Sequence, residues 1–196
     1  MTSNVSDAAK NLDQALILRS QLKVSSDATL EVIQPSMAEA LFGLIQRNKT
    51  RLSLFLLWPQ QVANIRDTKA FIQEQLIAIQ KGTAQIYAIH YQQNYAGIWS
   101  FVTINRQEKT AEIGYWLDGA LEGKGIISSV LKRLMECYAS QDIIQKFIIH
   151  CHVHNRKSQA VALRCGFRWD GLRSQVVSGQ QIAQNRYVRV FNSNCL

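Results

Sequence analysis

Residues 118–127 read DGALEGKGII and join two segments with different hydrophobic periods. The preceding residues, 111–117, are rich in aromatic and branched side chains, which is typical of a strand. From Ile126 to Tyr138, apolar residues recur at helical spacing. Glycines let a backbone approach a ligand closely, and the first N–H groups of a helix have no intrahelical partners. The pattern therefore predicts a phosphate-binding turn between a strand and a helix, to which Lys124 adds a positive charge.

Taken alone, glycines at this spacing also fit an ordinary tight turn. The dinucleotide fingerprint needs a third Gly or Ala where Ser128 stands, and the P-loop needs a Ser or Thr where Gly125 stands. Both nucleotide-binding motifs are therefore excluded, and the phosphate turn needs support from elsewhere in the chain.

That support comes from residues 155–167, which read as a short capped helix. Asn155 is a favoured N-cap residue, and Ser158 falls at the third helical position. Gly166 suits a left-handed C-terminal cap before Phe167 enters a strand. By itself this segment shows only the usual start and end signals of a helix. It supports the phosphate-binding turn because it follows the glycine turn in the chain.

In this order, the two elements resemble the acetyl-CoA site of the GNAT superfamily of N-acetyltransferases. The chain is similar to the RimJ/RimL type, which acts on ribosomal proteins, at residues 112–117, 123–128, 155–158 and 161–167, and to its RimL subgroup at residues 48–50 and 58–59. That subgroup acetylates the N-terminal serine of the acidic stalk protein of the large ribosomal subunit. The resemblance covers residues 28 to about 191. It implies an α+β GNAT fold, with a mixed, mostly antiparallel central sheet and helices on both faces, and acetyl-CoA as the acetyl donor.

The resemblance also implies roles for particular residues. Backbone donors to the pyrophosphate would come from Gly123, Lys124, Gly125, Ile126 and Ile127. The strand end at Trp116 and Leu117 would separate from its neighbour, pair with the pantetheine arm and offer an N–H to the thioester oxygen. Asn155 would contact the pantetheine chain, and Ser158 would lie near the sulfur and protonate the departing thiolate. The alternative is that Asn155 only caps the helix and Ser158 only occupies its first turn.

The general base is the role in which the chain departs from the resemblance. RimL-type enzymes carry an acidic residue on the segment after the short helix, whereas residues 173–181 contain none and Val177 stands at the matching position. We expect Glu112 to substitute, directly or through water, because GNAT enzymes often use a glutamate on this strand. Strand alternation places Glu112, Gly114 and Trp116 on one face. A surface glutamate without a catalytic role is the alternative.

The missing acid bears on the class of acceptor. An α-amine with a pKa of about 7.7–8 is about one-tenth neutral at pH 7, whereas a lysine amine with a pKa of about 10.4 is neutral in well under a thousandth of molecules. A strong base is therefore not required for an N-terminal amine, which favours that acceptor over a lysine side chain.

A rival constellation lies in His150, His152 and His154, which alternate along a predicted strand and so share a face. Three histidines on one face can ligate zinc or another transition metal. The resembling family uses no metal, and a polar strand face explains the pattern equally well. We therefore expect no metal.

The chain is basic, with 22 Lys and Arg against 14 Asp and Glu and a formal net charge of +8. Residues 101–196 hold 13 of the basic and 7 of the acidic residues, so +6 lies in the half with the predicted site. Such a surface attracts polyanions, whether the phosphates of CoA, nucleic acid or an acidic protein. The chain shows no RNA-binding aromatic motif, zinc finger or helix-turn-helix pattern, so we do not expect nucleic acid as a partner.

A length of 196 residues is typical of one domain. We expect residues 1–23 to form a partly flexible N-terminal extension and residues 24–196 to form a single GNAT acetyltransferase domain. No apolar run approaches membrane-spanning length, and residues 15–18 are too short for a signal-peptide core, so a cytoplasmic protein is expected. The four cysteines lack C-x-x-C spacing and are expected as thiols. The sequence does not decide whether the chain forms a homodimer.

Hydrophobic periodicity predicts the order of the elements. Strands are expected at 29–33, 84–90, 96–104, 110–117, 145–154, 167–172 and 182–191, and helices at 37–46, 52–57, 64–80, 126–140 and 155–166. The strands expected at 84–90, 96–104 and 110–117 are joined by polar turns, which indicates an antiparallel meander. A doubly wound sheet is disfavoured because no helices alternate with these strands.

Together these features predict an acetyl-CoA-dependent N-acetyltransferase, an acyltransferase of class EC 2.3.1.-. The expected acceptor is the N-terminal α-amine of a protein, an acidic ribosomal protein with an N-terminal serine. Two alternatives stay open. The acceptor is a small-molecule amine such as an antibiotic, a polyamine or an amino acid, or the chain binds acyl-CoA without catalysis.

Overall fold

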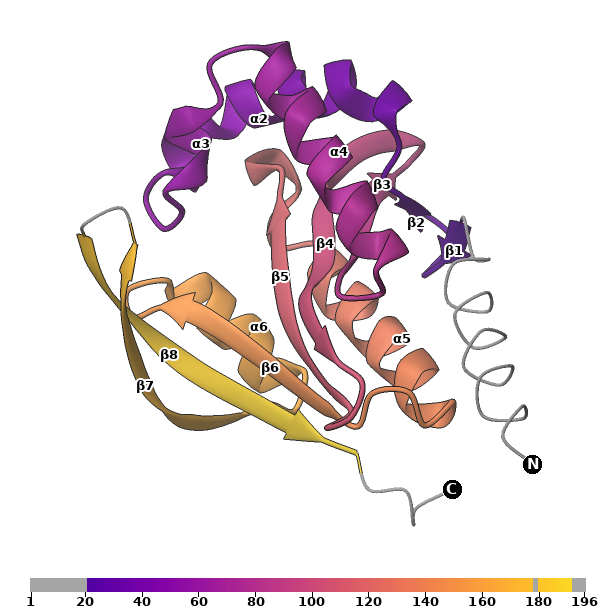
Figure 1. Cartoon of the computed structure of the whole chain (residues 1–196), viewed down its shortest axis with the longest axis vertical. Helices are drawn as coiled ribbons and strands as arrows, with labels where there is room; N and C mark the ends of the chain where they lie inside the picture. The colour runs from indigo at the N-terminus through magenta and orange to yellow at the C-terminus, as the bar shows by residue number, and fades with distance from the viewer. Residues whose placement is uncertain (1–20, 178–179, 192–196) are drawn as a thin grey trace.

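The structure, a computed structural model, describes residues 21–177 and 180–191. A single twisted sheet organises these residues (Figure 1). Its eight strands follow the order β1-β2-β3-β4-β5-β6-β8-β7. They are β1 (Gln21–Lys23), β2 (Ala28–Val32), β3 (Gln85–Tyr91), β4 (Asn94–Asn105), β5 (Thr110–Leu117), β6 (Lys146–His152), β7 (Arg168–Val177) and β8 (Gln180–Val190). All neighbours are antiparallel except β5 and β6, which are parallel. The expected mixed, mostly antiparallel sheet and its central meander are confirmed.

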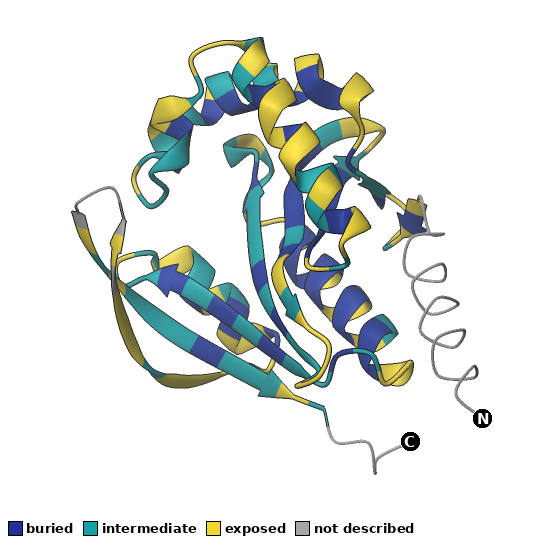
Figure 2. Cartoon of the chain, viewed as in Figure 1, coloured by how far each residue is buried: buried dark blue, intermediate teal, exposed yellow. Residues whose placement is uncertain are grey.

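Helices cover both faces of this sheet, as expected. The turn η1 (Pro35–Met37) with α2 (Ala38–Leu52) and α4 (Ile65–Gln80) packs on one face, and α5 (Ile126–Ser140) with α6 (Arg156–Arg164) packs on the other. Successive side chains of β4 point to opposite faces of the sheet and so enter both cores. Ile98 packs with α2 and α4, and Trp99 belongs to the cluster with α5. Figure 2 shows buried residues along β3, β4 and α5. The middle of the sheet is therefore packed between helices on both faces.

The prediction of a helix at residues 52–57 is wrong. Helix α2 runs past its expected end at residue 46 as far as Leu52, and turns follow, with the N–H of Leu56 donating to the Leu52 carbonyl at 3.0 Å. A short helix, α3 (Trp58–Gln61), starts only afterwards and carries Pro59 in its first turn. Proline is tolerated there because its missing N–H would have no intrahelical partner anyway. The apolar residues between the two helices therefore belong to a connection that reaches toward the sheet.

The two ends of the sheet also differ from expectation. Strand β1 pairs Leu22 with Leu30 of β2, so the sheet begins within the segment expected as an extension. The remaining residues of that segment, 1–20, lie outside the described residues, as does Cys195. At the other edge β7 continues to Val177, beyond the expected end at residue 172, because it forms a long hairpin with β8.

Among the described residues, no helix has both the length and the apolar composition that a bilayer crossing requires.

Candidate acetyl-transfer site

The strands β5 and β6 separate from one another near the middle of the molecule. Their parallel pairing runs from Thr110 and Lys146 to Ile113 and Ile149 and stops there, although both strands continue. Figure 1 shows the ends of the two strands diverging. We call the unpaired ends, residues 114–117 of β5 and 150–152 of β6, the splay. The separation expected at Trp116 and Leu117 is present, and it leaves one backbone edge of β5 without a strand partner.

The glycine turn lies directly beyond the splay, after the 3-10 turn η2 (Gly119–Leu121). Gly123 has φ +82° and Gly125 has φ +75°, values that side chains rarely adopt. Gly125 is the N-cap residue of α5, and no side chain caps this helix. A Cβ at either glycine would meet no atom within 4 Å, so the space beside the turn is open. Free N–H donors, a positive helix end and open space fit a pyrophosphate.

Helix α2 anchors this turn, a role that the sequence reasoning missed. The buried Asn48 side chain accepts a hydrogen bond from the Gly119 N–H at 2.9 Å and donates to the Leu44 carbonyl at 2.9 Å. Arg51 donates to the Leu117 carbonyl and to the carboxylate of Glu122, the latter at 2.5 Å. A signal was present in the sequence, since Asn48 follows Leu44 by four residues and so stands on the apolar face of the helix.

Two lysines lie at the turn. Lys157 of α6 pairs with the Glu122 carboxylate at 2.5 Å, so Glu122 links α6 to α2 through Arg51. The Lys124 ammonium lies 5.4 Å from the centroid of the Tyr91 ring. Lys124 stands within the turn, between its two glycines, and Lys157 is brought beside it from α6 through Glu122.

The start of α6, which carries the predicted site residues Asn155 and Ser158, lies beside the splay. Asn155 is the N-cap residue, and its side chain accepts a hydrogen bond from the Ser158 N–H at 3.1 Å. The Ser158 hydroxyl lies 2.9 Å from the hydroxyl of Tyr115 on β5. Burial raises the pKa of Tyr115, so this phenol stays protonated at any physiological pH. Burial also raises the pKa of the neighbouring Cys151 thiol, which a hydrogen bond to Ser158 only partly offsets.

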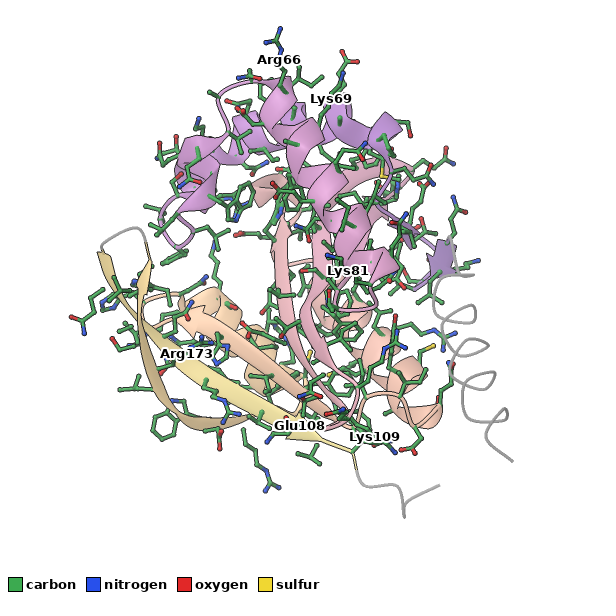
Figure 3. All side chains as sticks on the ribbon, viewed as in Figure 1. Arg66, Lys69, Lys81, Glu108, Lys109 and Arg173 are labelled. Atoms are coloured by element: carbon green, nitrogen blue, oxygen red, sulfur yellow. The ribbon has the colours of Figure 1, made fainter. Side chains whose placement is uncertain are left out.

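On the opposite face of the sheet, the structure brings Glu112 together with His150. Glu112 Oε1 lies 3.0 Å from His150 Nδ1, and Arg173 of β7, labelled in Figure 3, lies 3.9 Å from the other carboxylate oxygen. The hydrogen bond to His150 lowers the pKa of Glu112; burial opposes this, and the charges of Arg173 and Arg186 reinforce it. Glu112 is therefore an ionised member of a charged cluster and not a lone surface carboxylate.

The three histidines do not act as one group. His150 pairs with Glu112, whereas the His152 ring lies 5.9 Å from the ring of Phe55 in the connection between α2 and α3. His154 lies beyond the end of β6 and is exposed. In the portion of the chain described, no three His, Cys, Asp or Glu side chains are placed to hold a metal ion.

A sheet that opens between two parallel strands, with a glycine turn and an uncapped helix beyond the opening, defines the GNAT class of acetyltransferases. Comparison with known proteins agrees. The family model for the acetyltransferase (GNAT) domain matches residues 28–168, and the chain belongs to this family.

Within the family, the chain is similar to enzymes that act on ribosomal proteins. It is 37% identical to the ribosomal-protein-serine acetyltransferase of Escherichia coli (strain K12) over 174 residues, which cover 88% of this chain and 97% of that protein. It is 31% identical over 153 residues to the putative ribosomal N-acetyltransferase YdaF of Bacillus subtilis (strain 168), covering 76% of this chain and 82% of that protein.

Two solved structures superpose closely. The microcin C7 self-immunity acetyltransferase MccE, in complex with acetyl-CoA and AMP, has a TM-score of 0.85 and 37% identity over 90% of this chain and 99% of that one. RimL, the ribosomal L7/L12 α-N-protein acetyltransferase, in complex with coenzyme A, has a TM-score of 0.84 and 36% identity over 89% and 99%. The chain is thus an acetyl-CoA-dependent GNAT acetyltransferase of RimL-like type.

Proposed function

We propose that this chain acetylates the N-terminal α-amine of a protein, with an acidic ribosomal protein carrying an N-terminal serine as the substrate class. The observation that carries the proposal is the 37% identity to a ribosomal-protein-serine acetyltransferase over nearly the whole of that protein. The formal net charge of +8 complements an acidic partner. A ribosomal substrate would place the activity in the cytoplasm.

In this proposal the splay and the glycine turn bind the donor. Acetyl-CoA supplies the acetyl group as a thioester. Backbone N–H groups of residues 123–127 donate to the pyrophosphate, and the free edge of β5 at Trp116 and Leu117 donates to the carbonyl oxygen. Asn155 contacts the pantetheine chain, and Ser158 holds a proton at Oγ for the sulfur. Preorganised donors of this kind lower the barrier because they need no reorganisation during the reaction.

The acceptor would reach the splay from the face that carries α2 and α3. Phe55 packs against His152 of β6, and Trp58 packs against Trp116 of β5 with ring centroids 6.2 Å apart. The connection between α2 and α3, through Phe55, and the start of α3, through Trp58, therefore contact the two sides of the splay and line the approach to it. The other face is covered by α5 and α6, which leaves the α2 and α3 face for a polypeptide end.

A small-molecule amine is the second candidate acceptor. It is favoured by the similarity to MccE, which shares 37% identity with this chain and was solved with AMP beside acetyl-CoA. A nucleotide-sized acceptor and a peptide end both present a primary amine, so the donor site alone does not choose between them.

The test is an acceptor comparison with the purified chain. Thiol release from acetyl-CoA is measured with an acidic peptide that begins with serine, with the same peptide already N-acetylated, and with a panel of small amines. We expect turnover of the free peptide only. Mass spectrometry of protein N-termini from cells with and without the chain then identifies the substrate. Turnover confined to small amines contradicts the protein acceptor, and acetyl-CoA binding without any turnover supports a non-catalytic binder.

A further inference from the structure

His150 is a buried imidazole with one unused nitrogen. Its side chain is 8% exposed, and Nδ1 lies 3.0 Å from Glu112 Oε1. The other nitrogen, Nε2, is buried and has no hydrogen-bond partner among the described residues. Native proteins rarely leave a buried polar atom unpaired, because its lost hydration is not replaced. An unpaired nitrogen at this position therefore indicates a partner that the chain does not itself provide.

The Glu112 carboxylate lies 3.0 Å from His150 Nδ1, closer than the donor Arg173 at 3.4 Å, and so favours a proton on that nitrogen. A carboxylate only accepts hydrogen bonds, so it selects the tautomer with the proton on Nδ1 and leaves a lone pair on Nε2. Glu112 itself is a poor proton acceptor near neutral pH, since its hydrogen bond to His150 holds its pKa below the ordinary value. The pair thus has the arrangement of a base, the imidazole, oriented by a carboxylate.

The location of His150 suits the acceptor. It directly follows Ile149, the last residue of β6 that pairs with β5, and so stands where the splay begins. It shares a strand face with His152, which contacts Phe55 on the α2 and α3 side. Cys151, between them, is buried against α5 and α6 and is hydrogen-bonded to Ser158. A base at His150 and a proton donor at Ser158 therefore lie on opposite faces of the splay.

Three charged groups face His150 from the neighbouring strands. Glu112 comes from β5, Arg173 of β7 lies 3.4 Å from His150 Nδ1, and Arg186 of β8 stands opposite His150 in the strand register. Of these three groups Glu112 is the one acid, and it balances part of the charge of the two arginines beside the imidazole.

We propose that His150 Nε2 takes a proton from the acceptor ammonium, directly or through one water, and that Glu112 is a positioning residue acting through His150. This assignment rests on the proposed function. One ammonium N–H bond breaks as the Nε2–H bond forms, and the freed electron pair makes the N–C bond of the amide while the C–S bond breaks. The nitrogen loses a second proton; one of the two protons ends on the sulfur and the other in solvent. His150 thereby takes over the role for which residues 173–181 hold no acid.

The first experiment reads the tautomer without any reaction. Nitrogen NMR on the full chain with labelled histidine, in the absence of acetyl-CoA, reports whether each ring nitrogen carries a proton, and His150→Gln identifies the signals. At pH 8 we expect a proton on Nδ1 and none on Nε2. Glu112→Gln is expected to produce a mixture of tautomers. A proton on Nε2 in the unaltered protein would overturn the proposal.

The second experiment measures kcat/KM against pH with an acidic peptide that begins with serine. His150→Gln is expected to lose about 100-fold at pH 7, as removal of a general base does. The loss should shrink toward pH 9, because a peptide α-amine with a pKa of about 8 is then neutral without help. Glu112→Gln should lose about 10-fold, less than the loss of a proton-transferring group causes, since the imidazole remains. His154→Gln, an exposed histidine two residues beyond β6, is the matched control and should behave as the unaltered protein.

Calorimetric affinity for acetyl-CoA separates a base from a structural residue. We expect it to stay within about twofold in all variants, as for a group whose effect lies in the proton transfer. A His150→Gln profile superimposable on that of the active unaltered protein, or a loss equal at every pH with weakened acetyl-CoA binding, overturns the role of His150 alone. An unaltered protein that binds acetyl-CoA and acetylates no amine overturns the proposed function as well.

Discussion

The hydroxyl of Tyr115 lies 2.9 Å from the Oγ of Ser158, so that a side chain from β5 meets a side chain from α6 beside the splay. Tyr115 remains protonated because burial raises its pKa, and a phenol in that state can donate to the serine oxygen. A serine that accepts from Tyr115 keeps its own proton to donate, and in the proposed function it donates this proton to the sulfur of acetyl-CoA. The pair therefore gives Ser158 an orientation that helix capping alone does not explain.

We expect Ser158→Ala to lower kcat by about 100-fold, the contribution typical of general acid catalysis, while the KM for acetyl-CoA changes little. Tyr115→Phe keeps the ring and removes only the hydroxyl that orients Ser158, so it should lower kcat less than the loss of the general acid does, by about 10-fold. Steady-state kinetics with a peptide acceptor measure both. Full activity in Ser158→Ala would remove Ser158 from the mechanism.

Asn48→Ala is expected to weaken acetyl-CoA binding and to lower the free energy of unfolding. The part-buried Gly119 N–H loses its acceptor, while the Leu44 carbonyl keeps its partner within the helix; an unsatisfied buried group costs about 1–3 kcal/mol, which is the upper bound here. Gln46→Ala on the same helix is the matched control, since Gln46 donates to Val62 away from the turn. Calorimetry and denaturant unfolding measure the two effects. Equal acetyl-CoA affinity in both variants would contradict the anchoring role of Asn48.

Gly125→Ala tests the conformation of the turn. An alanine at φ +75° is strained by about 1–2 kcal/mol, although its Cβ meets nothing. We expect lower stability and weaker acetyl-CoA binding, because the strained turn moves its N–H groups. Gly43→Ala, inside α2 and also free of contacts, should instead stabilise by about 0.5–1 kcal/mol. If both variants gained stability, the left-handed geometry of the turn would be refuted.

As the pH decreases, the free energy of unfolding should fall, partly through the protonation of Glu112. Its pKa is lowered in the folded protein, chiefly by the hydrogen bond to His150. Its contribution is therefore fully present above the unfolded value of about 4.5 and is lost as pH falls through the folded pKa. Between pH 5 and pH 3, urea unfolding should show a shallower decline for Glu112→Gln than for the unaltered protein. Glu136→Gln, an exposed position on α5, should keep the original slope, and a common slope for all three would exclude this linkage.

The errors in the predicted elements share one cause. The apolar run at residues 52–57 fits a helix by composition, yet it forms a connection in which Phe55 packs against His152 of β6. The strand expected to end at residue 172 continues to Val177 because β8 pairs with it along its length. In both places a distant partner decided between local conformations that the sequence leaves nearly equal in energy.

Residues close together in the chain determined the parts of the site that the sequence predicts by itself. The glycine turn before α5 and the cap of α6 by Asn155 depend on backbone dihedrals and on hydrogen bonds three residues apart. Tertiary structure alone decided which face of the splay each group occupies. Asn48 reaches Gly119 across 71 residues and Tyr115 reaches Ser158 across 43, while the parallel register of β5 and β6 sets Glu112 beside His150. Such contacts follow from strand register and helix packing, which no local pattern encodes, because their energies arise only when the whole sheet has formed.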